Sequence, residues 1–333
     1  MSAADLLLAD AGAVRALAAD ALEPAPDDGA RIARVVAAAF GDATLALIHY
    51  GSHAQRSGAR SDSAYDYFVI VRGYEPAYRA LAATRGLRRS PRTAALLNRI
   101  LPPNVLALRI AGEGETALAK CAVLSLADLE RAVSPRARDH FVLGRLFQHV
   151  QLLEPRDGAS RDAVLRCIAE SRARTIDWGR PYLPERFDAD RYLLALLARS
   201  FAGEIRPEAE QRLDALTGAQ RGALAPVYAQ VLQRLESLKI THREGGVHRL
   251  AEAVPAAERR RWERYFARSK RRATARWGKY VLLYDDWLAY LLAKIERRSG
   301  QRILLTEKER RWPLIFLWPR AFRYLRQRPQ VRR

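Results

Sequence analysis

Hydrophobic and polar positions at the start of the chain alternate between strand-like and helix-like patterns. Residues 45–50 form a short apolar run of strand type, and residues 65–71 form a second run rich in aromatic and β-branched side chains. Apolar positions at helical spacing precede the first run at residues 30–40 and follow the second at residues 74–89 and 90–99. This order predicts an α/β domain whose sheet begins with the two runs.

Two further apolar runs extend that sheet. Residues 104–110 and 117–124 flank Gly112 and Gly114, which predicts a β-hairpin. Ser125 follows the second run and precedes an apolar helical stripe, so it is a predicted helix N-cap.

The middle of the chain is mainly helical in pattern. Helices are expected at residues 162–177, 188–202, 207–216 and 219–238. Two short β-prone runs, residues 239–243 and 247–250, then flank Gly245-Gly246 and predict a second hairpin. Helices that end in a small hairpin indicate a winged-helix-like unit, a fold used both for DNA binding and for packing.

The last part of the chain is basic and amphipathic. Residues 258–276 and 277–298 are expected to form two helices, the second of which ends at Ser299-Gly300. In residues 310–326, Trp, Phe and Leu are interleaved with Arg. This pattern is typical of an element that lies in a membrane interface, with its guanidinium groups at the lipid phosphates. The alternative is a segment that docks on its own domain.

Charge is concentrated in this last part. The chain carries 57 Lys and Arg against 37 Asp and Glu, a net charge of +20, and residues 255–333 hold 23 basic and 7 acidic side chains. An Arg-rich and Ala-rich composition does not explain a concentration at one end. It indicates an anionic partner.

Cysteine content and hydropathy indicate in which cellular compartment the protein is expected. Cys121 and Cys167 are the only cysteines and form no CxxC motif, which predicts a reducing compartment and no cysteine metal site. The apolar run at residues 314–318 is far shorter than the ~20 residues that cross a bilayer. The acidic first 26 residues do not resemble a secretory signal or a transit peptide. We therefore expect a cytoplasmic protein.

The candidate chemistry lies around the first two strands. Gly51-Ser52 directly follows the first strand, and Asp66 lies near the start of the second. Glycine lets backbone N–H groups approach a phosphate and the Ser hydroxyl adds a donor, so this turn suits a nucleoside triphosphate. The Asp66 carboxylate is a hard ligand for Mg²⁺, which offsets charge on the phosphates during nucleotidyl transfer. The order predicts a nucleotidyltransferase site; the other interpretation is an ordinary turn and a structural aspartate.

The second metal ligand stays open. The polymerase-β-like superfamily, which this order resembles, places two acids as Asp-x-Asp on the second strand, and the first of those positions here is Ala64. Asp62 shares the period-two face with Asp66, and Glu113 or Glu115 is an equally open choice.

Several short segments together resemble one family. They are YGS at residues 50–52, DYFVIV at 66–71, KCAVLS at 120–125, LADL at 126–129, GRLFQHV at 144–150, SFAGEIR at 200–206 and RATAR at 272–276. In this order they resemble the mitochondrial-type CDP-diacylglycerol synthases, the phosphatidate cytidylyltransferases of the translocator assembly and maintenance family. No single segment is diagnostic, but the colinear set spans most of the chain.

The family is similar in layout to the α/β (α+β) fold predicted here. That fold has a polymerase-β-like nucleotidyltransferase domain at residues 1–158, a helical winged-helix-like domain at residues 159–254, and a basic amphipathic membrane-associating region at residues 255–333. The resemblance implies Mg²⁺-dependent formation of CDP-diacylglycerol and pyrophosphate from CTP and phosphatidic acid. The protein would work as a peripheral enzyme on the inner face of the cell membrane.

The resemblance also implies roles for particular residues. Asp66 would bind Mg²⁺, with Asp62 or Glu113 as a second acid, and Lys120 would take part in catalysis by contacting a phosphate. Contacts to CTP are implied for Tyr50, Gly51, Ser52, Lys120 and Arg145. The candidate contacts for the lipid phosphate are Arg268, Arg272 and Arg276.

Two other functions are compatible with the sequence. One is a soluble nucleotidyltransferase that acts on RNA, a protein side chain or a small molecule. The other is a non-catalytic winged-helix protein that binds DNA, favoured by Ala64 and by Arg72, where the family pattern leads us to expect an acid. The Trp, Phe and Leu content of the C-terminal segment favours lipid, so no nucleic-acid partner is expected.

Overall fold

The computed structural model of the chain describes residues 3–8, 11–57, 63–85, 87, 89–111, 116–202, 210–283 and 305–311. By its contacts the chain divides into two units, Met1–Leu283 and Tyr284–Arg333. The second unit contributes one described helix, α14 (Glu307–Arg311), preceded by Thr306, whose Oγ1 accepts a hydrogen bond from the Glu309 backbone N–H at 3.3 Å. The first unit holds all other described elements.

A five-stranded mixed sheet forms one end of the first unit, with strand order β3-β4-β2-β1-β5. Its strands are β1 (Thr44–Tyr50), β2 (Tyr65–Val71), β3 (Asn104–Ala111), β4 (Thr116–Ser125) and β5 (Gln151–Leu153). The pair β2–β4 is parallel, and the other neighbouring strands are antiparallel. The two predicted strands and the predicted hairpin of β3 and β4 are therefore confirmed, and the chain is a mixed α/β protein.

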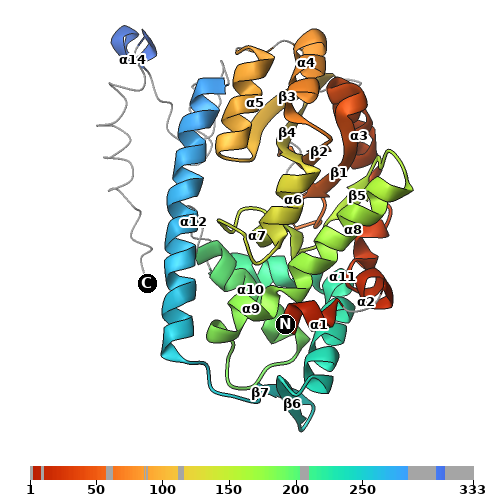
Figure 1. The fold of residues 1–333 in the computed structure, drawn as a ribbon, viewed down its shortest axis with the longest axis vertical. Helices are drawn as coiled ribbons and strands as arrows, with labels where there is room; N and C mark the ends of the chain where they lie inside the picture. The colour runs from red at the N-terminus through yellow and green to blue at the C-terminus, as the bar shows by residue number, and fades with distance from the viewer. Residues whose placement is uncertain are drawn as a thin grey trace. The chain divides into compact units, whose positions relative to one another are not determined.

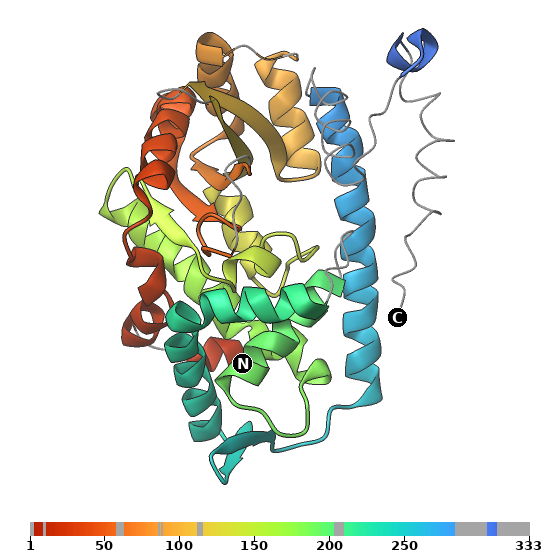
Figure 2. The same cartoon turned by 180° about the vertical axis from the view of Figure 1, so that it is seen from behind.

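Helices cover both faces of the sheet (Figures 1 and 2). One face packs against α3 (Asp27–Phe40), α4 (Tyr74–Arg85) and α5 (Pro91–Ile100) through a core of its own. The other face packs against α6 (Leu126–Val133), α7 (Leu143–Leu146) and α8 (Gly158–Ala173). Alternate residues of each strand supply the two cores, as the period of two requires. As predicted, Ser125 caps α6 by accepting the backbone N–H of Asp128 at 3.2 Å.

The second core continues beyond the sheet into a helical region. The elements there are α1 (Ala3–Leu7), α2 (Ala11–Leu17), the 3₁₀ turns η1 (Ala19–Leu22) and η3 (Arg180–Tyr182), α9 (Thr175–Gly179), α10 (Ala189–Ala202), α11 (Glu210–Ser237), the hairpin β6 (Thr241–Glu244) and β7 (Val247–Leu250), and α12 (Ala256–Leu283). The 3₁₀ turn η2 (Gly41–Ala43) lies at the sheet, between α3 and β1. A buried ion pair between Arg172 and Asp20 joins the N-terminal helices to α8, and His149 Nδ1 lies 2.8 Å from the same carboxylate.

Two pairs of predicted helices are continuous in the structure. The helices expected at residues 207–216 and 219–238 form the single helix α11, whose described part begins at Glu210. Thr217 lies inside this helix, and its hydroxyl donates to the Leu213 carbonyl at 2.8 Å. The helices expected at residues 258–276 and 277–298 likewise join in α12 up to Leu283, and the remainder lies outside the described residues.

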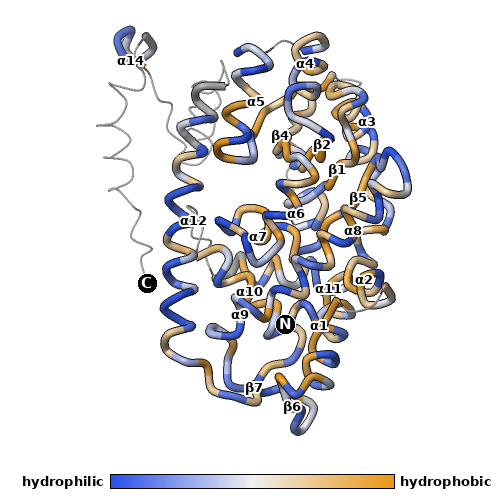
Figure 3. Tube along the Cα trace, in the orientation of Figure 1, coloured by the Kyte–Doolittle hydropathy of each residue, from blue (hydrophilic) through white to orange (hydrophobic). Residues whose placement is uncertain are grey.

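Helix α12 runs alongside the whole first unit, from the hairpin β6–β7 to α5 (Figures 1 and 2). Most of its length is hydrophilic, in contrast to the strands (Figure 3). Tyr265 and Phe266 nevertheless bury their rings in the core. Lys279, near its end, donates to the carbonyls of Leu101 and Pro103, the latter at 3.0 Å. Among the described helices, none combines the length and the hydropathy that crossing a bilayer requires.

Candidate active site

Three of the predicted site residues stand in a row across the sheet. Tyr50 on β1 is the register partner of Asp66 on β2, and Asp66 is the register partner of Lys120 on β4. All three lie on the face that packs against α6, α7 and α8, because they alternate with residues of the other core. Lys120 Nζ lies 3.7 Å from Asp66 Oδ1, and the two side chains are 28% and 25% exposed. Asp66 and Lys120 thus form a charge pair that solvent reaches.

The turn after β1 packs closely against the Asp66 carboxylate. Gly51 has a φ of +83°, and a Cβ at this position would lie 2.9 Å from Asp66 Oδ2. A residue other than glycine would therefore be strained in its backbone and would clash with the carboxylate. The Ser52 carbonyl accepts the Ser57 N–H at 3.1 Å, and the Gly51 carbonyl accepts the Gln55 N–H at 2.9 Å. The backbone consequently folds back on itself beside Asp66.

Tyr50 connects this turn with Arg145. The Tyr50 ring is buried and stacks on Phe68, with 4.5 Å between the ring centroids. The Arg145 guanidinium lies 5.8 Å from the Tyr50 centroid and 4.0 Å from that of Phe141, and it donates to the Phe141 carbonyl at 2.8 Å. Burial, and after it the charge of Asp66, raises the pKa of Tyr50. The phenol therefore stays protonated at neutral pH and is a donor.

Helix α12 reaches the same place through two other arginines. Arg272 Nε and Arg276 Nη2 each donate to Asp139 Oδ2 at 2.7 Å. The Arg276 guanidinium also lies 4.9 Å from the Phe141 centroid, so Phe141 has Arg145 and Arg276 against its ring. Burial would raise the pKa of Asp139, but Arg276 outweighs it and holds the pKa below its ordinary value. Asp139 is therefore a carboxylate at neutral pH and holds α12 in place.

The structure thus brings together five of the predicted residues and separates others from them. Those that meet are Tyr50, Gly51, Asp66, Lys120 and, through the Tyr50 ring, Arg145. Ser52 follows in the adjoining turn and is partly exposed. Of the three predicted lipid-phosphate contacts, Arg272 and Arg276 are bound to Asp139, and Arg268 is exposed, with its Nε 3.3 Å from the Arg138 carbonyl oxygen. Asp62 and Glu113 lie outside the described residues.

The residues present fit a magnesium ion bound together with a nucleotide. Mg²⁺ is commonly held by one or two carboxylates, with the rest of its ligands from substrate phosphates and water. Asp66 offers such a carboxylate, partly exposed and beside a glycine turn. Within the described residues, no group of three or more His, Cys, Asp and Glu side chains has the arrangement of a metal site. The acids predicted as a second ligand, Asp62 and either Glu113 or Glu115, lie outside the described residues.

Sequence reasoning missed several residues that shape the site. Asp139 and Phe141 lie between two helices, in a stretch without a regular pattern of polar and apolar positions. His53 was also missed; its ring stacks on Tyr65 at 3.9 Å between centroids, and its Nε2 lies 3.1 Å from the Ser63 carbonyl oxygen. The signal that could have indicated His53 is its own imidazole ring, which stands in an otherwise polar loop. We find no sequence signal that would have indicated Asp139.

Comparison with known proteins assigns no relative. No known family model matches the chain, and no curated protein matches it. Function is therefore inferred from the residues of the site and from the sequence resemblance given above.

Proposed function

We propose that this protein is a Mg²⁺-dependent nucleotidyltransferase, and specifically a phosphatidate cytidylyltransferase that makes CDP-diacylglycerol and pyrophosphate from CTP and phosphatidic acid. The observation that carries the proposal is the position of Asp66. One of its carboxylate oxygens faces a glycine turn with positive φ, and the other faces Lys120 on the neighbouring parallel strand. A metal-binding acid, a phosphate-binding turn and a cation are thereby within reach of one triphosphate.

The reaction needs positioning more than proton transfer. The phosphatidate phosphate is already an anionic nucleophile; its oxygen forms a bond to the α-phosphorus as the bond to pyrophosphate breaks. Asp66 would hold the metal ion, which when bound offsets charge on the α-phosphate and the departing pyrophosphate. Lys120 would bind a phosphate oxygen, and the Tyr50 phenol and Arg145 are donors at the adjoining edge. Two anions must be brought together, and these cations reduce their repulsion.

The assignment of two domain types to the fold is part of the same proposal. The order β1, Gly51-Ser52, loop, β2 with Asp66 supports a polymerase-β-like nucleotidyltransferase domain at residues 1–158. Helices α8 to α11 followed by the hairpin β6–β7 support a winged-helix-like domain at residues 159–254. A bridge between Phe187 and His248 attaches that hairpin to the segment before α10. The boundaries at residues 158 and 254 stay predictions.

A lipid phosphate is the favoured acceptor because a basic helix adjoins the site. Helix α12 reaches Phe141 through Arg276, and Arg145 contacts the same ring and that of Tyr50. Its exposed arginines and lysine would face an anionic surface. The choice of cytidine and of phosphatidic acid rests on the sequence resemblance described above. We place the protein on the cytoplasmic face of a membrane, as a peripheral enzyme.

The test is a transfer assay with the full chain. Protein, labelled CTP, Mg²⁺ and phosphatidic acid vesicles are incubated, and the lipid is extracted and counted. We expect label in CDP-diacylglycerol, none without Mg²⁺, and at least ~100-fold less with the Asp66→Asn variant. Label that appears in RNA or protein offered in place of the vesicles would support the soluble alternative. No transfer to any acceptor would reject the enzymatic proposal.

A further inference from the structure

Three buried glutamines form a chain of hydrogen bonds that ends at the turn after β1. Gln55 in that turn, Gln148 after α7 and Gln220 on α11 are 6%, 5% and 1% exposed. Gln148 Oε1 accepts from Gln55 Nε2 at 3.1 Å and from Gln220 Nε2 at 3.4 Å. Buried side-chain amides destabilise a fold unless they are paired. The three amides therefore join segments that lie far apart in the sequence.

Backbone groups fix the direction of this chain. Gln148 Nε2 donates to the Gly144 carbonyl at 2.6 Å, and Gln220 Oε1 accepts the His149 N–H at 2.9 Å. A carbonyl oxygen accepts and an N–H donates, so Gln148 presents its Oε1, and Gln220 its Nε2, to the middle of the chain. Gln55 has to present Nε2 to the same oxygen. The link between the turn and Gln148 thus has one arrangement.

The segment that carries Gln148 is itself held by buried groups. The Phe147 carbonyl accepts from the Tyr228 hydroxyl at 2.6 Å, and the Gln148 carbonyl accepts from Arg172 Nη2 at 3.0 Å. Both donors are fully buried. The Gln148 N–H donates to the Arg145 carbonyl at 3.2 Å. Gln148 therefore has a fixed place relative to α8, α11 and Arg145.

The turn after β1 is attached to this segment through Gln55. Its own backbone hydrogen bonds, such as the one from the Gln55 N–H to the Gly51 carbonyl, close the turn on itself and do not fix its place. Among the described residues, the bond between Gln55 and Gln148 joins the turn to the segment after α7. Gly51 lies against Asp66, and Arg145 lies near the Tyr50 ring. Gln148 consequently links two sides of the candidate site.

We propose that Gln148 is a positioning residue for nucleotidyl transfer: through Gln55 it holds the Gly51-Ser52 turn at one place relative to Asp66 and Arg145. The inference rests on the proposed function, which assigns this turn to the triphosphate. Gln148 is buried, so it acts through the turn and not on the substrate. A displacement of about 1 Å in a group that positions substrate can lower a rate ~100-fold.

The test is Gln55→Met in the full chain. Methionine has a similar length and no amide, and Gln148 Oε1 still accepts from Gln220. We expect kcat/KM for CTP to fall at least ~10-fold. The affinity for CTP with Mg²⁺, measured by calorimetry without lipid, should fall as well. The KM for phosphatidic acid should change by less than about twofold, because the turn is not assigned to the lipid.

Gln220→Met is the matched control. It removes the other donor to Gln148 Oε1 and leaves the His149 N–H without its acceptor, so the melting temperature should fall at least as far as in Gln55→Met. The turn keeps its bond to Gln148, and kcat/KM for CTP should stay within about twofold of the wild-type value. Rates are compared below the melting transitions of both variants.

Gln148→Met tests the acceptor itself. It should lower kcat/KM for CTP as Gln55→Met does, and the double variant should lose little more, because both changes remove the same hydrogen bond. If Gln148→Met does not fold, the comparison of Gln55→Met with Gln220→Met still decides.

Two results would overturn the inference while the proposed function stands. One is a Gln55→Met protein with wild-type kcat/KM for CTP. The other is an equal loss of activity in Gln55→Met and Gln220→Met, which would make the glutamine chain structural. A wild-type protein that neither binds nor turns over CTP would instead reject the proposed function, and the inference with it.

Discussion

At the scale of single residues, the Asp66 carboxylate has two different neighbours. Its two carboxylate oxygens face different groups, Lys120 at 3.7 Å and the Gly51 turn. A carboxylate whose only role was structural would gain little here, because a partly exposed ion pair is worth about 1 kcal/mol or less. Loss of its charge should therefore affect chemistry far more than stability.

Asp66→Asn should lower nucleotidyl transfer at least ~100-fold, since the amide is a poor ligand for Mg²⁺ and a few kcal/mol of transition-state stabilisation are lost. The melting temperature should change by no more than a few degrees. Steady-state rates with CTP and phosphatidic acid measure the loss of transfer, and calorimetry measures the melting temperature. Asp28→Asn, an exposed acid on α3, is the control and should be neutral in both. Turnover above a tenth of the wild-type rate would make Asp66 structural.

His49 gives the fold a dependence on pH. The ring is buried, Nδ1 lies 3.1 Å from Gln151 Oε1, and burial lowers its pKa from 6.5 to about 4. Between pH 6.5 and about 4, His49 is therefore protonated in the unfolded chain and neutral in the folded chain. Stability is full above pH 6.5 and falls as the pH drops toward 4, by up to about 3 kcal/mol.

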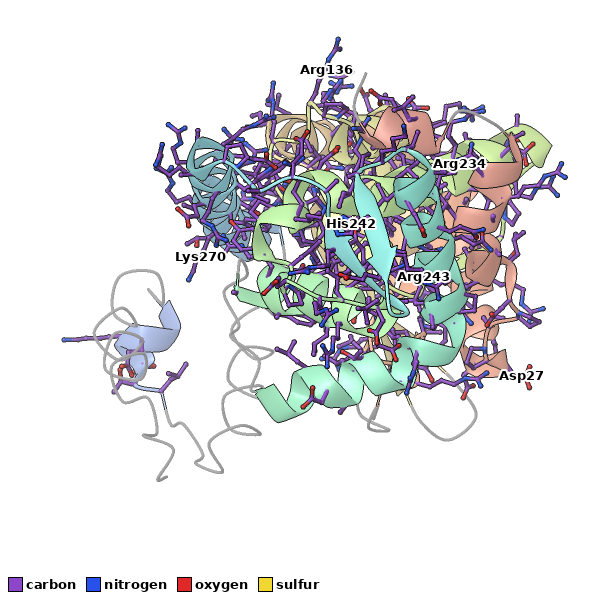
Figure 4. The ribbon with its side chains drawn as sticks, turned by 90° about the horizontal axis from the view of Figure 1, so that it is seen from below. Asp27, Arg136, Arg234, His242, Arg243 and Lys270 are labelled. Atoms are coloured by element: carbon purple, nitrogen blue, oxygen red, sulfur yellow. The ribbon has the colours of Figure 1, made fainter. Side chains whose placement is uncertain are left out.

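Urea unfolding between pH 7.5 and 5 measures this effect. Replacing His49 with Gln should remove about half of the fall, because burial also lowers the pKa of His140, to about 3, and the contribution of His140 remains. Replacing His242, which is exposed on the hairpin β6–β7 (Figure 4), should leave the fall as it is. A slope in the His49→Gln protein that equals the wild-type slope would show that His49 does not contribute.

At the scale of elements, one buried acid, Asp139, contributes strongly to the attachment of α12. Asp139 accepts from Arg272 and Arg276, and Arg276 is buried and also donates to the Pro102 carbonyl at 2.6 Å. Loss of the carboxylate would leave a buried guanidinium without its counter-charge. The many exposed charges of α12 offer nothing comparable, because surface pairs contribute little.

Asp139→Asn should destabilise the protein by about 3 kcal/mol, the usual cost of breaking a buried pair from one side. It should also make α12 sensitive to limited proteolysis under conditions that leave the wild type intact. Glu263→Gln removes an exposed acid from the same helix and serves as the control. If both variants unfold at the wild-type urea concentration, Asp139 does not hold the helix.

The elements differ in how far local sequence could predict them. Strands β1 and β2 and the hairpin β3–β4 were predictable because alternation and turn residues act over short distances. The continuity of α11 was not, since the polar Thr217-Gly218 pair suggests a break. There Gln220 accepts the His149 N–H at 2.9 Å and packing maintains the helix. The placement of Lys120 beside Asp66 depends on parallel pairing between distant strands, which no local pattern encodes; only the resemblance indicated it.

At the scale of the whole molecule, catalysis and membrane contact are expected to separate. Deleting residues 312–333, which lie outside the described residues, should release the protein from anionic vesicles. The deleted stretch holds Trp and Phe with six arginines, and each basic residue near such a surface adds about 1 kcal/mol. Activity on vesicle-embedded phosphatidic acid should fall, while activity on a monomeric short-chain substrate should persist.

Flotation with anionic liposomes and assays on both substrates check this prediction. If the truncated protein floats as well as the full chain, the anchor lies elsewhere, and residues 277–298 are the next candidate. If it also loses activity on the soluble substrate, the segment belongs to the folded active site.

The parallel pairing of β2 with β4 has a consequence for the candidate site. Strands β1 and β2 form one antiparallel ribbon, and β3 and β4 form another, each closed within a short length of chain. Asp66 belongs to the first ribbon and Lys120 to the second, so the two charges meet only where the ribbons join. Neither ribbon alone contains the charge pair. The proposed site therefore lies across the junction of the two ribbons, and separation of the ribbons would part Asp66 from Lys120 without unfolding either one.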